Sequence, residues 1–290
     1  MKWYAGLHAR SEFGNDTVPF VQALADIAEM GFAGVMLLWM DGGPVLREGV
    51  EATGCFLDLA QCDLRLVRRA LDDHGLEAGV VWTAIDLADD AAVSRSVERL
   101  RRLRDMALEL GCRFICHSAG VAEAPGLPLE AKKEGLDRLA RVMDAVAAES
   151  AGGPVYVAAD VHYHGIAESI ADCEYLIARL ACPNAGPLLN IGHLTTCRQP
   201  GWELAERHPD RIRIVGWKDH VLGRPDMPVY SVELGAGDAP LEKYVAVLRP
   251  QQVERRHVIA FEHVPTSERK AALARSLRYM QRLWAQTGQA

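Results

Sequence analysis

The sequence predicts a single-domain α/β protein in which residues 1–290 form a (β/α)8 barrel. Eight short apolar runs alternate with eight longer amphipathic stretches along the chain. The mean repeat, 290 residues over eight units or roughly 36, suits a strand, a helix and two connections. No segment rich in Pro, Gly or Ser divides the chain, so we expect one closed parallel barrel and not two domains.

The apolar runs are rich in Val, Ile, Leu and aromatic residues and are too short to be helices. This composition is typical of strands that are buried on both faces, as in a parallel sheet. The runs are Trp3–Leu7, Gly34–Met40, Ala78–Trp82, Phe114–Cys116, Val155–Ala159, Pro187–Leu189, Ile212–Trp217 and Val258–Phe261.

The stretches between these runs have helical spacing of apolar residues. Several have start or stop signals: Asn15-Asp16-Thr17 supplies N-cap residues for the first, and Gly75 and Gly111 follow two others as C-cap residues. The expected helices are Val18–Met30, Asp63–His74, Asp90–Leu110, Pro128–Ser150, Ala167–Leu180, Pro200–His208, Leu241–Leu248 and Ser267–Gln286.

Composition excludes several classes of function. The net charge of −7 argues against binding of nucleic acid, which needs a basic surface. No apolar run approaches the roughly 18–20 residues that span a bilayer, so we expect a cytoplasmic protein without a membrane partner. The seven cysteines include no CxxC pair, and reduced thiols are expected. Gly235-Ala236-Gly237 lacks the third glycine of a dinucleotide motif, so no nucleotide cofactor is expected.

Titratable residues gather just after the predicted strands, at the end of a barrel where active sites lie. Asp160 and Glu262 each end a buried apolar run, and either point into the barrel mouth or pair with Lys218 or an arginine. Any single histidine here could be a hydrogen-bonded loop residue, but together they indicate a site. Seven of the ten histidines occupy such positions: His8, His117, His162, His164, His193, His220 and His263.

The segment after the fifth predicted strand is a candidate metal site. Asp160, His162 and His164 would share one face if the strand continued, and two imidazoles at this spacing can hold one metal. Gly165 favours the alternative, which is a turn.

Short motifs at four strand ends carry a family resemblance through their order and spacing. The chain resembles the xylose isomerase-like TIM barrels of the sugar phosphate isomerase/epimerase superfamily, which have Glu-x-His, Asp-x-Gly-His, His-x-Lys-Asp and Glu after strands five to eight. The matching segments here are Asp160-Val161-His162, Asn190-Ile191-Gly192-His193, Gly216-Trp217-Lys218-Asp219 and Glu262.

The resemblance implies one divalent metal, Mn, Mg, Zn or Co, bound by Asp160, Asn190, His193 and Glu262. The ligand set departs from the family's: Asp160 is one methylene shorter, Asn190 is neutral, and Gly216 stands where the third ligand is expected. Two outcomes follow. The histidines at positions 162, 164, 193 or 220 replace the lost ligands, or the histidines do proton chemistry without a metal.

The resemblance also implies an isomerase or epimerase that acts on a small polyhydroxylated carbonyl compound through an enediolate. Asp160 and Glu262 would be the acid/base pair, with His193 and Lys218 at the oxyanion. A lyase or dehydratase with the same first step, and a non-catalytic binding or scaffold barrel, are the alternatives. A homodimer is expected from the fold. The expected substrate-binding residues are His117, His162, His164, Trp217, Lys218 and His220.

Overall fold

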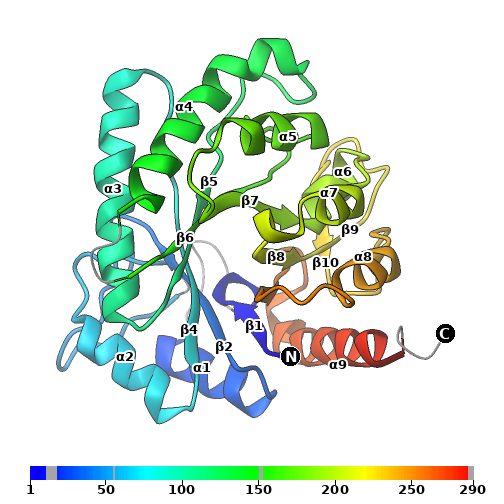
Figure 1. The fold of residues 1–290 in the computed structure, drawn as a ribbon. Coiled ribbons are helices and arrows are strands. Elements are labelled where there is room, and N and C mark those ends of the chain that lie inside the picture. Colours follow the sequence, from blue (N-terminus) through cyan, green and yellow to red (C-terminus); the bar gives the residue numbers. More distant parts are fainter. Residues whose placement is uncertain (11–17, 55, 150–152, 287–290) are drawn as a thin grey trace.

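Eight parallel strands close into a barrel, which confirms the predicted fold (Figure 1). The structure is a computed structural model and describes residues 1–10, 18–54, 56–149 and 153–286. The strands pair in the order β1-β2-β4-β5-β6-β7-β8-β11, and β11 pairs again with β1. They are β1 (Trp3–Gly6), β2 (Gly34–Trp39), β4 (Glu77–Thr83), β5 (Phe114–Ser118), β6 (Tyr156–Asp160), β7 (Ala185–Asn190), β8 (Ile214–Trp217) and β11 (Arg256–Ile259).

The helices surround this barrel (Figure 1). The side chains of Asp63, Asp89 and Ser169 cap three of the helices, whereas the expected cap at Asn15-Asp16-Thr17 and the expected helix end at Ser150 lie outside the described residues. The predicted helices correspond to α1 (Phe20–Glu29), α2 (Leu64–Asp73), α3 (Asp90–Glu109), α4 (Leu129–Ala147), α5 (Ile170–Arg179), α7 (Gly201–Arg207), α8 (Leu241–Leu248) and α9 (Arg269–Gln286).

Several short elements were not predicted, because each is shorter than the window over which periodicity is visible. The most important is α6 (Ile191–Thr196), which begins directly after β7. Single 3-10 turns lie at Leu7–Ala9, Pro209–Arg211 and Thr266–Glu268. The additional strands are β3 (Phe56–Leu57), parallel to β2, and the antiparallel pair β9 (Asp219–His220) and β10 (Ser231–Val232).

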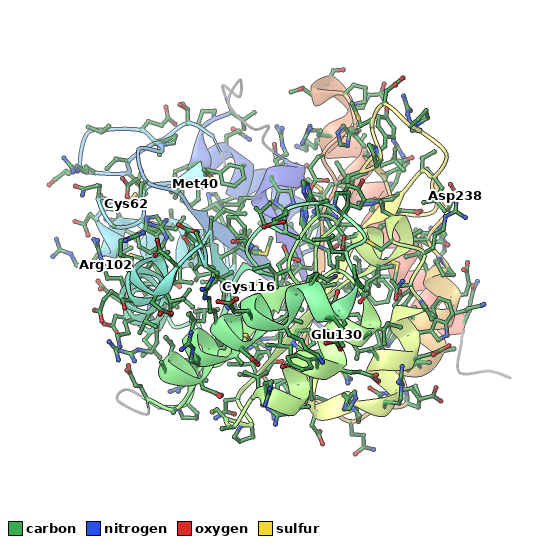
Figure 2. All side chains as sticks on the ribbon, turned by 90° about the horizontal axis from the view of Figure 1, so that it is seen from above. Met40, Cys62, Arg102, Cys116, Glu130 and Asp238 are labelled. Atoms are coloured by element: carbon green, nitrogen blue, oxygen red, sulfur yellow. The ribbon has the colours of Figure 1, made fainter. Side chains whose placement is uncertain are left out.

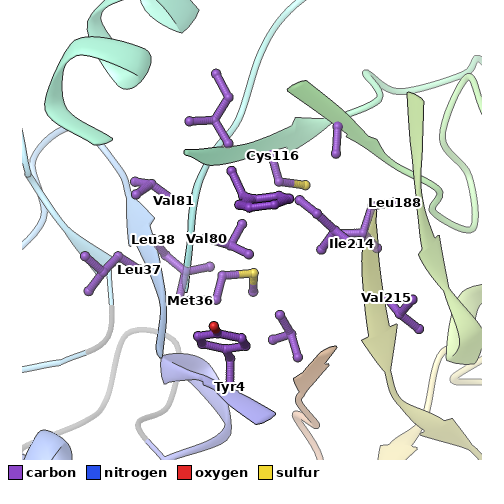
Figure 3. Close-up of a cluster of buried hydrophobic side chains, with 14 of the residues drawn as sticks. Tyr4, Met36, Leu37, Leu38, Val80, Val81, Cys116, Leu188, Ile214 and Val215 are labelled. Carbon is purple, nitrogen blue, oxygen red and sulfur yellow. The ribbon is translucent and has the colours of Figure 1, made fainter. Parts of the chain in front are cut away.

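Successive residues of each strand alternate between the barrel interior and the surrounding helices. Figure 3 shows Met36 and Val80 in the space that the strands enclose, while Leu37, Val81 and Val215 point away from it. Cys116 of β5 is fully buried and lies near the middle of the molecule in Figure 2, further in than Glu130 of α4. Apart from the register shift where β2 pairs with β4, the inward positions of the barrel strands are the even-numbered residues, and this parity decides which side chains reach the site.

The described cysteines, at positions 62, 112, 116, 173, 182 and 197, are free thiols. No helix in the described part of the chain has the length and apolar character that crossing a membrane requires.

Candidate active site

A cavity of about 430 Å³ opens at the carboxyl ends of the barrel strands, where the sequence predicted the site. Asp160 and Glu262, which are 102 positions apart in the chain, both line it. Polar side chains come mainly from the ends of β1, β6, β7, β8 and β11, and apolar side chains come mainly from β2, β3 and β4. The polar lining residues are His8, Ser118, Asp160, His162, Tyr163, His164, Asn190, Lys218 and Glu262.

Lys218 and Glu262 form an ion pair in the cavity wall, with Lys218 Nζ 2.6 Å from Glu262 Oε1. Both follow barrel strands at inward positions, Lys218 after β8 and Glu262 after β11. The Lys218 side chain is 12% exposed, so water screens the pair only weakly. Burial raises the pKa of the Glu262 carboxyl, but the charges of Lys218 and His8 outweigh it and hold that pKa well below its usual range. The Glu262 carboxyl is therefore ionised at neutral pH.

Asp160 and Asn190 form a second polar pair across the ends of β6 and β7. Asn190 Nδ2 donates a hydrogen bond of 2.8 Å to Asp160 Oδ1. This contact turns the amide oxygen, Asn190 Oδ1, away from Asp160, and that oxygen is buried without a hydrogen-bond partner among the described residues. A buried acceptor without a donor is costly, so a ligand that supplies a donor there would bind favourably.

Two residues without an assigned role in the sequence analysis complete the Glu262 side of the cavity. His8 follows β1, lines the cavity and places its Nε2 3.4 Å from Glu262 Oε1. Arg269, at the start of α9, is 1% exposed and donates hydrogen bonds to the backbone oxygens of His8 and Glu262. The guanidinium therefore holds the ends of β1 and β11 together. The sequence signal for this role is that Arg269 lies seven residues after Glu262.

The segment after β6 is a turn, as Gly165 suggested, and β6 ends at Asp160. The turn is closed by a hydrogen bond of 2.8 Å from the Gly165 N–H to the His162 oxygen. His164 has a φ of 66°, which is unfavourable for a residue with a side chain. Asp160, His162 and His164 nevertheless all line the cavity.

A buried ion cluster, formed by Lys132, Glu168 and Asp172, supports this turn. Glu168 accepts the His164 N–H through Oε2 at 3.0 Å, which holds that residue in its unfavourable conformation. Lys132 Nζ lies 3.3 Å from Glu168 Oε1 and also pairs with Asp172. All three side chains are at most 4% exposed. Lys132 of α4 and Asp172 of α5 therefore position Glu168, which holds the turn at the cavity.

His193, which was expected to contact an oxyanion or metal, lies behind the cavity wall. It belongs to α6, is 1% exposed and does not line the cavity. Its ring stacks on His162 with centroids 3.5 Å apart, and its Nδ1 accepts the Tyr163 N–H at 3.3 Å. Burial, together with the charges of His162, Lys218 and His220, lowers the pKa of His193 well below its usual value. The neutral ring supports His162.

Three expected substrate-binding residues also lie away from the cavity. His117 and Trp217 occupy odd-numbered, outward positions of β5 and β8 and are fully buried. Trp217 donates a hydrogen bond of 3.1 Å to His257 Nδ1 in the layer between barrel and helices. His220 is buried beside His193, and its Nδ1 lies 2.8 Å from Thr196 Oγ1.

Other residues that the sequence predicted for the site do lie at the cavity. His162, His164 and Lys218 line it, as do both expected catalytic carboxylates.

The residues do not fit the family's divalent metal. Gly216 lines the cavity without a donor atom, Asn190 presents its amide nitrogen to Asp160, and Lys218 occupies an oxygen of Glu262. An ammonium beside the carboxylate repels a second cation. Across the described residues there is no group of three or more His, Cys, Asp and Glu side chains arranged to hold a metal ion. The alternative in which histidines replace the lost ligands is not supported by this arrangement.

The comparisons with known proteins agree on the fold. The family model "xylose isomerase-like TIM barrel" matches residues 24–283. Among solved structures, an IolI protein with a bound zinc atom covers 100% of both chains at 14% identity with a TM-score of 0.76. An L-ribulose 3-epimerase covers 99% of this chain and 96% of its own at 16% identity with a TM-score of 0.71.

The probable 3-DHS dehydratase AsbF of Bacillus anthracis covers 97% of this chain and 99% of its own at 15% identity, with a TM-score of 0.68. No curated protein sequence matches the chain.

Proposed function

Because the chain belongs to the xylose isomerase-like TIM-barrel family, we propose that it is an isomerase or epimerase of a small hydroxylated carbonyl compound. The observation that carries the proposal is the Lys218–Glu262 ion pair, which faces the same cavity as the Asp160 carboxylate. A fixed cation and a carboxylate base in one partly enclosed site are what proton abstraction beside a carbonyl requires.

Asp160 is the base in this proposal. Its Oδ1 accepts the Asn190 amide, and its second oxygen accepts no hydrogen bond from the described residues. The low pKa of Glu262 makes that carboxylate a poor base. Asp160 would therefore take the proton from the carbon next to the carbonyl, and the C–H electron pair would form the enediolate double bond.

Lys218 stabilises the charge that develops on the carbonyl oxygen. An ammonium has three N–H donors, and Glu262 accepts one of them, which leaves two for a ligand. Return of the proton by Asp160 to the neighbouring carbon, with the hydroxyl proton passing from one enediolate oxygen to the other, gives an isomer. Delivery of a proton to the opposite face of the original carbon gives an epimer, and in this proposal the Lys218 ammonium beside Glu262 gives that proton; the proton held by Asp160 then returns to Lys218 through water.

The divalent metal that the resemblance implies forms no part of this mechanism, because its donor set is incomplete. The IolI structure contains zinc, which is a property of that protein.

A lyase or dehydratase remains the second candidate, because it shares the enediolate and differs only in expelling a leaving group. The structural similarity to a probable 3-DHS dehydratase supports this second candidate. A non-catalytic binding barrel is the third candidate, and the incomplete metal-ligand set is what favours it.

Proton exchange in D2O tests the proposal and separates the three candidates. Dihydroxyacetone, D-fructose and 2-hydroxycyclohexanone are incubated with the protein, and 1H NMR follows the α-proton. We expect deuterium in recovered substrate and isomer. Loss of water or of a fragment would instead identify the lyase, and a complete lack of exchange with every probe would favour the binding barrel.

The variants Asp160→Asn and Lys218→Met assign the exchange to the cavity. Each is expected to lower the exchange rate at least about 100-fold, because each removes one partner of the proton-transfer step. Lys133→Met is the matched control, because that lysine lies on α4 and its side chain is 38% exposed. Full activity of Asp160→Asn would contradict the assignment of the base.

A further inference from the structure

The cavity has two chemically different walls. β2, β3 and β4 contribute Met36, Leu38, Phe56 and Trp82. The first three carry no strong hydrogen-bonding group, and Trp82 offers a single N–H donor. Figure 3 shows Met36 directed into the barrel interior. The apolar surface continues onto the opposite side as Leu188 and Val258.

The polar groups are confined to the other wall and to the mouth. Asp160, Asn190, Lys218 and Glu262 come from the ends of consecutive strands β6, β7, β8 and β11. Of the charged groups that line the cavity, two are carboxylates and one is an ammonium, and no arginine is among the lining residues. The site therefore has no excess of positive charge with which to hold a phosphate or a second carboxylate.

The apolar wall sets a condition on the substrate. A hydroxyl group that is buried against Met36, Leu38 or Phe56 would lose its hydrogen bonds to water and gain none, which is unfavourable. A CH or CH2 group in the same place gains from burial. The hydroxyls of the substrate must therefore lie on the side of Lys218 and Asn190.

We propose that the substrate of this site is an uncharged α-hydroxyketone whose far side is an apolar ring, aromatic or alicyclic. The inference rests on the proposed function and narrows the expected polyhydroxylated compound to one with hydroxyls at one edge only. The carbonyl oxygen accepts from Lys218 Nζ, and the α-hydroxyl donates to Asn190 Oδ1, the buried acceptor that is otherwise without a partner. The ring lies against Trp82 and Phe56.

Two cyclohexanones of the same ring size test this preference. 2-Hydroxycyclohexanone carries one hydroxyl. Pentahydroxycyclohexanone carries one hydroxyl on each of the five ring carbons that are not the carbonyl. Isothermal titration calorimetry on the full chain measures both dissociation constants. We expect the monohydroxy compound to bind at least about tenfold more tightly. Equal or tighter binding of the pentahydroxy compound, or no binding of either up to millimolar concentration, would overturn the proposal.

A pair of methionine variants locates the preference. Met36→Gln replaces an apolar wall group with an amide of similar length, and is expected to reduce the preference for 2-hydroxycyclohexanone at least about threefold. Met227→Gln is the control, because Met227 is 41% exposed and does not line the cavity. Since both ligands are measured on the same protein, loss of folded material cancels in their ratio. An unchanged ratio in Met36→Gln would overturn the placement of the ring.

The calorimetry needs no reaction, so it separates this inference from the proposed function. Tight binding of 2-hydroxycyclohexanone without deuterium exchange would support the substrate class and contradict the reaction. Suppose instead that D-fructose exchanges deuterium and binds more tightly than both apolar probes, 2-hydroxycyclohexanone and 2-hydroxyacetophenone. That result would support the reaction and overturn the substrate class. 2-Hydroxyacetophenone serves as the aromatic probe in both assays.

Discussion

Lys218 Nζ lies 2.6 Å from Glu262 Oε1, so the chain itself places a cation beside a carboxylate of the cavity. The positive charge of this site is therefore built into the chain. Because Asn190 has turned its amide nitrogen toward Asp160, the second carboxylate also has a protein donor. Lys218 neutralises the charge of Glu262, and Asn190 gives Asp160 a hydrogen-bond donor, while the glycine at position 216 has no donor side chain.

Removal of divalent metal is expected to leave proton exchange unchanged within about twofold, because Lys218 supplies the charge at the oxyanion. The measurement is the deuterium-exchange rate before and after dialysis against EDTA, with metal analysis of the same sample. Readdition of Mn2+ or Zn2+ should not increase the rate. One equivalent of bound metal, together with a rate that falls on dialysis and returns with Mn2+, would contradict the built-in cation.

Hydrophobic patterning was sufficient for the barrel strands and most helices, since each predicted run overlaps an observed element. It failed where elements are short. α6 has six residues and includes Ile191-Gly192-His193 of the motif in which His193 was expected to be a ligand. The helix instead turns His193 behind the wall, where it supports His162.

Which face of a strand looks inward could not be predicted from one sequence, because both faces of a parallel barrel strand are apolar. His117 and Trp217 sit at strand ends just as Lys218 and Asp160 do, but their odd-numbered positions direct them outward. Asp160 fixes the parity of β6, and its register opposite Ser118 would have assigned His117 to the outer face. That register comes only from the structure.

The buried histidines outside the cavity make stability depend on pH. Burial lowers the pKa of His117 to about 4 and that of His257 to about 3, from an ordinary value near 6.5. His220 is lowered to about 3, by burial first and then by Lys218. In the pH range from about 6.5 down to 4 the unfolded chain therefore binds more protons than the folded chain. Stability falls as pH falls, by up to about 1.4 kcal/mol per pH unit for each histidine.

His257→Gln isolates one of these protons, because a glutamine oxygen can still accept the Trp217 N–H and does not titrate. Urea titrations between pH 4.5 and 6.5 give the free energy of unfolding at each pH, and its slope against pH measures how many more protons the unfolded chain binds. We expect that number to be smaller for this variant by up to about one. The wild-type chain supplies the reference slope. A variant with the wild-type slope would show that His257 does not remain neutral in the folded protein.

Adjacent lysines on α4 give a direct measure of what the buried ion cluster contributes. Lys132 is 3% exposed and bonds Glu168 and Asp172, whereas Lys133 is 38% exposed and bonds only Glu130 among the described residues. Lys132→Met leaves two buried carboxylates without a cation, and is expected to lower the free energy of unfolding by about 3–5 kcal/mol. Lys133→Met breaks an exposed pair, and is expected to change it by no more than about 0.5 kcal/mol.

The same pair of variants tests whether the cluster holds the cavity loop. Glu168 bonds the His164 N–H, so loss of Lys132 should loosen the turn at His162–Gly165 and weaken binding of 2-hydroxycyclohexanone at temperatures where the protein is still folded. Amide hydrogen exchange at His164 and calorimetric titration below the unfolding transition measure the two effects. If Lys132→Met lowers stability but leaves exchange at His164 and ligand affinity at wild-type values, the cluster stabilises the α4–α5 contact alone and does not position the loop.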